Sequence, residues 1–219
     1  MEKISNNHKK KIIYLFDSSN SLKSLHHITH LSIREENNIY TIAILDKSIS
    51  GGDHWKKYFD SYHIVSTIDD QKDPCPMSFS EVTESIKKEN IDSLNTIIVP
   101  YGEYTSILAA QLREEFGIKG HKISDATPFR DKIKMKGFAE KSVKVPSYTS
   151  FDKEKYLKYR ATYFDSSTFK IPFPFVIKPV NAASALATKV INSVADIHLI
   201  DEALQEFSGD FELEEFIEG

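Results

Sequence analysis

The sequence has 219 residues, of which 40% are hydrophobic and 27% are charged, and its formal net charge is -4. This composition is that of a globular protein and excludes a disordered, collagen-like or coiled-coil chain. The weak negative charge argues against a nucleic-acid partner, and no apolar run approaches the roughly 20 residues of a membrane helix. The single cysteine, Cys75, cannot form an internal disulfide. We therefore expect a cytoplasmic protein.

The first part of the chain alternates short apolar runs with helical periodicity. The runs predict strands over 11–16, 39–45, 62–67 and 96–99. Helices are predicted over 79–90 and 105–116, with Gly117 placed as a C-terminal stop. Continuous apolar strands are typical of sheets that are buried on both faces. The pattern predicts an α/β domain with a mostly parallel sheet.

The second part changes character. A helix is predicted over 129–141, an extended segment over 143–148, and a helix capped by Asp152 with Leu157, Ala161 and Phe164 on its apolar side. A strand pair over 173–180 and 188–191, a helix opened by Ser193 and a last strand over 211–217 follow. That last strand has no evident partner, so we expect the front part of a larger protein or a chain that needs a second polypeptide.

Four segments in order carry a family resemblance. They are 97–103 followed by 109–120, 129–136 with its Arg-Asp-Lys, 173–180 with its Val-Ile-Lys-Pro, and 213–219 with its Glu-Glu-Phe-Ile. This succession resembles the ATP-grasp superfamily, and within it the carboxylate–amine and carboxylate–thiol ligases.

The resemblance implies a fold and a reaction. The fold is α/β: a Rossmann-like pre-ATP-grasp domain at 1–124, the first ATP-grasp subdomain at 125–210, and the adenine linker with the start of a missing second subdomain at 211–219. In the implied reaction, ATP phosphorylates a small carboxylate, and an amine then attacks the acyl-phosphate. The partners would be these small substrates and a missing C-terminal half or complementing chain, with a homodimer left open.

Two lysines are implied to contact the ATP phosphates, namely Lys132 and Lys178. A lysine ammonium suits phosphate oxygens because it is a compact charge with three donors. Lys178 lies on an apolar strand, where a cation calls for a counter-ion. The alternatives are that Lys178 reaches solvent at a strand end, and that Lys132 belongs to a solvated helix face together with Lys134 and Lys136.

The linker is implied to bind adenine through four residues. Glu214 would accept a hydrogen bond from the adenine amino group, and the segment through Glu215, Phe216 and Ile217 would read and enclose the ring. The alternative is an edge strand whose acidic side chains face water.

The segment expected to cover the phosphates, 181–187, has no glycine. Left-handed backbone conformations, which let amides approach phosphates closely, are harder to reach without glycine. Its Ser184 hydroxyl is the donor implied to contact ATP. Magnesium is expected, but its ligands would lie outside this chain, and we therefore expect no turnover by this polypeptide alone.

Other candidates are weaker. Glu103 follows a parallel strand and is implied to border the substrate, or else it is an acid favoured at a helix N-terminus. His26 and His30 form a metal-binding spacing without a third ligand, and Cys75 has no partner cysteine. The first strand ends in Asp17-Ser-Ser-Asn, which argues against a dinucleotide site.

Two rival functions stay open: a non-catalytic nucleotide-binding or assembly module of the same fold, and an unrelated α/β interaction domain.

Overall fold

The computed structural model describes residues 9–17, 36–52, 54–68, 75–160, 162–164 and 170–218. The chain forms two compact units. The N-terminal unit comprises 1–70 and 75–126, and the C-terminal unit comprises 71–74 and 127–219. The histidine pair at 26 and 30 lies outside the described residues. Among the described residues, none of the helices combines the length and apolar character needed to cross a membrane.

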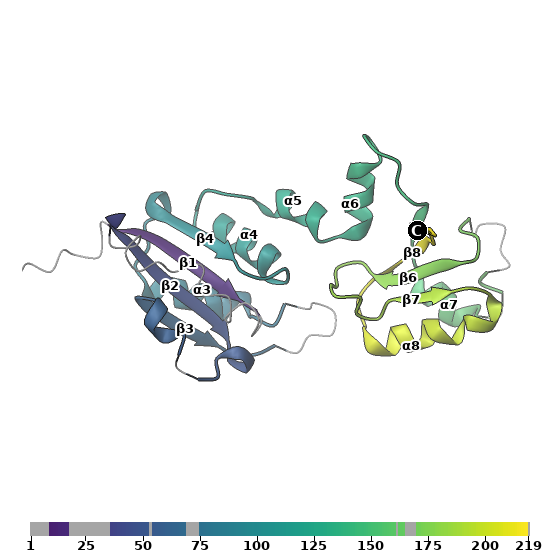
Figure 1. Cartoon of the computed structure of the whole chain (residues 1–219), viewed down its shortest axis with the longest axis horizontal. Coiled ribbons are helices and arrows are strands. Elements are labelled where there is room, and N and C mark those ends of the chain that lie inside the picture. Colours follow the sequence, from purple (N-terminus) through teal and green to yellow (C-terminus); the bar gives the residue numbers. More distant parts are fainter. Residues whose placement is uncertain are drawn as a thin grey trace, which may run out of the picture. The chain divides into compact units, whose positions relative to one another are not determined.

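The N-terminal unit is built on a four-stranded parallel sheet (Figure 1). Its strand order is β3-β2-β1-β4, with bounds β1 Lys10–Phe16, β2 Ile39–Asp46, β3 Ser61–Val65 and β4 Thr96–Pro100. Among the described residues of this unit, the helices are α3 Phe79–Lys88, α4 Thr105–Glu115 and α5 Ile123–Ala126, and three short 3-10 helices span Lys47–Ile49, Lys56–Tyr58 and Ser93–Asn95. The predicted parallel α/β domain is confirmed.

Strand alternation explains why this sheet is buried on both sides. Ile13 and Ile42 point to the face covered by α3 and α4, whereas Phe16 and Leu45 point to the opposite face and pack against the fully buried Trp55. Helix α4 ends as expected before Gly117, whose φ of 64° is accessible to glycine at low cost.

The C-terminal unit is built on a four-stranded antiparallel sheet in the order β5-β8-β6-β7 (Figure 1). The strands are β5 Tyr148–Ser150, β6 Phe175–Pro179, β7 Lys189–Ile191 and β8 Phe211–Glu215. The helices are α6 Lys132–Ala139, α7 Lys153–Lys158 and α8 His198–Glu206, with 3-10 turns at Thr127–Phe129 and Val194–Asp196. Apolar side chains of α7 and α8 cover one face of the sheet.

The last strand is not short of partners, which corrects the expectation from the sequence. β8 lies between β5 and β6 and pairs with both. Its backbone groups are therefore satisfied within this unit, and the strand forms the centre of the sheet rather than an unfinished edge. Phe211 and Leu213 point to the helix-covered core.

Three predicted boundaries were also wrong. Helix α6 spans only Lys132–Ala139, and the extended strand begins at Tyr148 rather than 143. Asp152 caps α7 as predicted, but α7 ends at Lys158, so Phe164 lies beyond the helix, and residue 161 lies outside the described residues. Tyr156 is fully buried instead, and Leu157 is exposed. A six-residue helix presents one inward position, and the larger ring of Tyr156 takes it.

Candidate nucleotide-binding site

The face of the C-terminal sheet opposite the helices is charged. Residues directly opposite each other in an antiparallel pair share a face. In this register Lys178 lies opposite Glu212, and Glu214 follows two residues later on the same side of β8. Helix α6 contributes Lys136 to this group. We call Lys136, Lys178, Glu212 and Glu214 the charged cluster.

The four side chains of the charged cluster form a closed set of ion pairs. Lys178 Nζ donates to Glu214 Oε1 at 2.7 Å and lies 3.7 Å from Glu212 Oε1. Lys136 Nζ donates to Glu212 Oε1 at 2.5 Å and also contacts Glu214 Oε2. Two positive and two negative charges balance, which reduces the cost of removing them from water.

Burial differs within the charged cluster. The Glu212 side chain is 0% exposed and that of Lys136 is 12% exposed, whereas Lys178 is 21% exposed. Burial acts to raise the pKa of Glu214, but hydrogen bonds from Lys136 and Lys178 and their charges outweigh it and leave that pKa below its ordinary value. Glu214 is therefore an ionised acceptor at neutral pH.

Lys132 has a different environment from Lys178, although both belong to the C-terminal unit. Its ammonium donates to the carbonyl oxygens of Pro179, Val180 and Ala182 at 2.9, 3.4 and 2.6 Å. Arg130 donates to the carbonyl of Asn181 at 2.6 Å. These two cations tie the beginning of loop 181–187 to the start of α6.

The glycine-less loop nevertheless adopts left-handed backbone conformations. Ser184, Ala185 and Ala187 have φ values of 56°, 57° and 48°. A side chain at such a position costs roughly 1–2 kcal/mol relative to the ordinary right-handed region. The loop thus reaches by strain the conformations that glycine would give freely. Ser184 is exposed, and Ala187 is buried.

The linker residues follow β8 closely. The Glu215 carboxylate accepts from the Ser147 amide at 3.0 Å, and this hydrogen bond lowers the pKa of Glu215. The Phe216 amide donates to the Pro174 carbonyl at 3.3 Å. Phe216 and Ile217 follow Glu214 and Glu215 in the sequence, and their side chains are exposed. Two exposed apolar side chains therefore follow the ionised carboxylate along the chain.

Glu103 lies in the other unit. It is an exposed residue between the end of β4 and the start of α4. Nearby, Asp17 at the end of β1 accepts from the Thr105 amide at 3.2 Å, so a carboxylate already occupies the N-terminus of α4. Gly102 allows this approach, since a Cβ there would lie 1.8 Å from Asp17 Oδ1.

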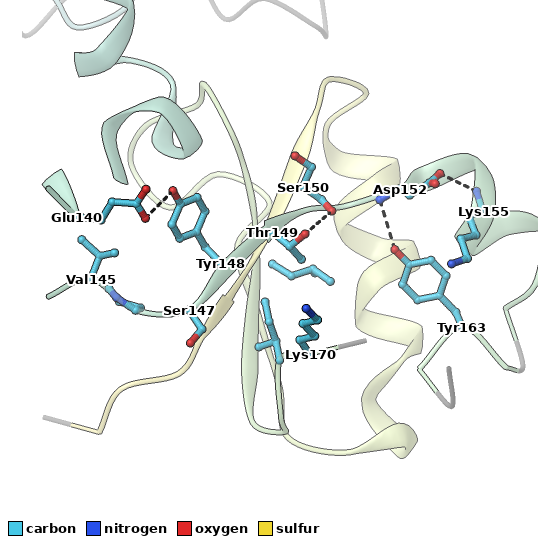
Figure 2. A pocket seen from close by; sticks show the side chains of 13 residues that line it. Glu140, Val145, Ser147, Tyr148, Thr149, Ser150, Asp152, Lys155, Tyr163 and Lys170 are labelled. Carbon is cyan, nitrogen blue, oxygen red and sulfur yellow. Dashed lines mark hydrogen bonds between the residues drawn. The ribbon is translucent and has the colours of Figure 1, made fainter. Parts of the chain in front are cut away.

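A pocket of about 650 Å³ lies beside the edge strand β5 (Figure 2). Tyr148, whose hydroxyl donates to Glu140 at 3.3 Å, and Tyr163, whose hydroxyl accepts from the Asp152 amide at 3.3 Å, contribute to its wall. None of the residues predicted to contact nucleotide lines this pocket. Across the described part of the chain, no three or more His, Cys, Asp or Glu side chains gather to hold a metal ion.

Sequence reasoning missed two members of the charged cluster. Lys136 was named only in the alternative of a solvated helix face, whereas its side chain lies against two glutamates. Glu212 was not considered. The alternation Phe-Glu-Leu-Glu over 211–214 was the available signal, because it places both glutamates on the face opposite the apolar core.

Three solved structures are similar to this chain over nearly its whole length. An L-amino acid ligase from Bacillus licheniformis matches 96% of this chain and 45% of its own, with 13% identity and a TM-score of 0.65. The biotin carboxylase domain of Hydrogenobacter thermophilus 2-oxoglutarate carboxylase, a dimer with MgADP, matches 95% and 44%, with 17% identity and a TM-score of 0.62. The VanG D-Ala:D-Ser ligase from Enterococcus faecalis matches 97% and 64%, with 17% identity and a TM-score of 0.61.

These likenesses establish the fold. The chain has an α/β fold that is similar to part of each of these ligase and carboxylase structures, and this confirms the fold class expected from the sequence. It spans a little under half the length of the first two of these proteins. No protein-family model matches the sequence, and no curated protein is significantly similar to it. Because the identities are low, the activity must be argued from the residues.

Proposed function

We propose that this chain is the ATP-binding portion of an ATP-dependent ligase that joins a small carboxylate to an amine through an acyl-phosphate. The observation that carries the proposal is Lys178, a partly exposed ammonium that lies between two glutamates on the sheet face opposite α7 and α8. The fold supports this class of reaction. The proposed location of the protein is the cytoplasm.

Lys178 is proposed to contact the phosphates. Among the described residues, its ammonium pairs with two carboxylates, and a polyphosphate is a more highly charged acceptor of the same chemical kind. Glu214 is proposed to accept from the adenine amino group, with Phe216 and Ile217 against the ring and Glu215 holding the strand end at Ser147.

Loop 181–187 is proposed to cover the phosphates, with the Ser184 hydroxyl as a donor. Lys132 supports this loop by donating to the Ala182 carbonyl and to the carbonyls of Pro179 and Val180, which precede the loop. Direct contact between Lys132 and a phosphate stays a prediction, as does contact between Glu103 and substrate. Magnesium is expected to be held outside this chain, and we assign it no step.

A calorimetric titration with ATP tests the proposal. Lys178→Met should weaken ATP binding by about tenfold or more, since a hydrogen bond between charged groups contributes about 1.5–3 kcal/mol. The matched control is Lys189→Met, on the neighbouring strand. Lys189 is 22% exposed and pairs with Glu206 at 2.6 Å, but its register position places it on the helix-covered face. Equal affinities for the two variants, or no ATP binding by the wild type, would refute the proposal.

The strained loop favours one alternative, a non-catalytic nucleotide-binding or assembly module of the same fold. Three non-glycine residues hold left-handed conformations under strain, so the loop that would cover the phosphates is less stable than a loop built with glycines. ADP release by the full-length protein, supplied with carboxylate and amine substrates, separates the two functions. Release supports the ligase, and ATP binding without release supports the module.

A further inference from the structure

Lys136 is fixed on three sides by groups of the C-terminal unit. Its ammonium lies 2.5 Å from Glu212 Oε1, contacts Glu214 Oε2, and sits 5.3 Å from the centre of the Tyr148 ring. The side chain is nearly buried. Lys134, two residues earlier on the same helix, is exposed and lies 3.6 Å from Asp131 Oδ2. Helix α6 thus directs one lysine into the sheet and the other toward water.

The two oxygens of Glu214 are divided between the two lysines. Oε1 accepts from Lys178, the more exposed lysine, and Oε2 contacts Lys136, the more buried one. Any ligand that draws Lys178 away therefore releases Oε1 alone. Oε2 stays bound, so the carboxylate keeps both its charge and its orientation.

Glu212 keeps Lys136 in place. Its side chain is fully buried, and its second oxygen, Oε2, has no hydrogen-bond partner among the described residues. Lys178 lies 3.7 Å from the same Glu212 oxygen that Lys136 approaches to 2.5 Å, and a buried carboxylate holds most strongly to its nearer cation. Lys136 is therefore the less exchangeable of the two lysines.

We propose that Lys136 is the positioning residue for base selection at this site. This inference rests on the proposed ATP-binding function. When phosphate takes Lys178, Lys136 holds Glu214 Oε2, and the released Oε1 accepts from the amino group of a 6-aminopurine. A 6-oxopurine presents an acceptor at that position and meets the carboxylate unfavourably. The site then prefers ATP to GTP because of a residue that touches neither nucleotide.

The test compares binding of ATP, GTP and inorganic triphosphate by calorimetry. The main variant is Lys136→Met with Glu212→Gln, which removes the cation without leaving a buried charge unpaired. ATP affinity should fall about tenfold, whereas affinities for GTP and triphosphate should stay within about threefold. Lys134→Met is the matched control and should leave all three affinities unchanged.

Two further variants keep the proposal falsifiable. Lys136→Arg keeps the charge and should retain the preference for ATP. If the double variant does not fold, Lys136→Gln, whose amide still donates to one carboxylate, should lower the ATP-to-GTP ratio at least about threefold. An unchanged ratio, or an equal loss for all three ligands, overturns the assignment to Lys136. A wild type that binds neither ATP nor triphosphate overturns the proposed function itself.

Discussion

Glu214 shows how a single protonation couples the site to stability. Its pKa is lowered in the folded state by Lys136 and Lys178 despite burial. A lowered carboxylate pKa stabilises the folded state above the unfolded pKa of about 4.3, and this stability is lost as the pH falls through the folded pKa. The same charge that would bind adenine therefore helps to hold β8 to α6 and β6.

Acid unfolding should reveal this contribution. We expect the free energy of unfolding of the wild type to fall as the pH drops below about 4.3. In Glu214→Gln, whose amide does not titrate, the fall should be shallower, because one of the depressed carboxylates is gone. Urea unfolding between pH 3 and pH 7 measures both slopes. Parallel curves for the two proteins would show that Glu214 is not stabilised by its lysines.

At the scale of elements, periodicity predicted most of the fold. The apolar runs located β1, β2 and β4 because strands buried on both faces need continuous apolar sequence. Helix α7 was placed by its Asp152 cap, but its end was not, since nothing local marks Lys158. The central position of β8 depends on pairing with residues 32 to 66 positions earlier, which local patterns do not encode.

The same reasoning applies to the site. Lys178 and Glu214 could be singled out from short motifs, but their pairing could not, because β6 and β8 meet only in the tertiary fold. Lys136 was missed for the same reason. One helix carries Lys132, Lys134 and Lys136, and only packing decides which of them faces a carbonyl, water or a glutamate.

The backbone of loop 181–187 leads to a stability prediction. Ala185→Gly should raise the free energy of unfolding by up to about 1 kcal/mol, because relief of the left-handed strain exceeds the added entropy of the unfolded chain. Ala183→Gly, at a position without positive φ, is the matched control and should lower it by about 0.5–1 kcal/mol. Urea unfolding measures both. A loss of similar size in both variants would contradict the described loop conformation.

At the scale of the whole molecule, the two units have separate hydrophobic cores. The strand ends of the N-terminal sheet already carry a carboxylate, Asp17, at the N-terminus of α4. All residues proposed to contact the nucleotide directly lie in the C-terminal unit, and Glu103 is assigned to substrate only. We therefore propose that ATP binds to the C-terminal unit.

Hydrogen exchange of backbone amides, measured on the full chain with and without saturating ATP, tests this assignment most directly. A bound ligand slows the opening of the segments that contact it. We expect ATP to protect the backbone amides of β6, loop 181–187 and β8 and to leave those of β1 and β2 unchanged. In Lys178→Met this protection should be lost. Protection confined to the N-terminal unit, or none in either unit, would contradict this assignment.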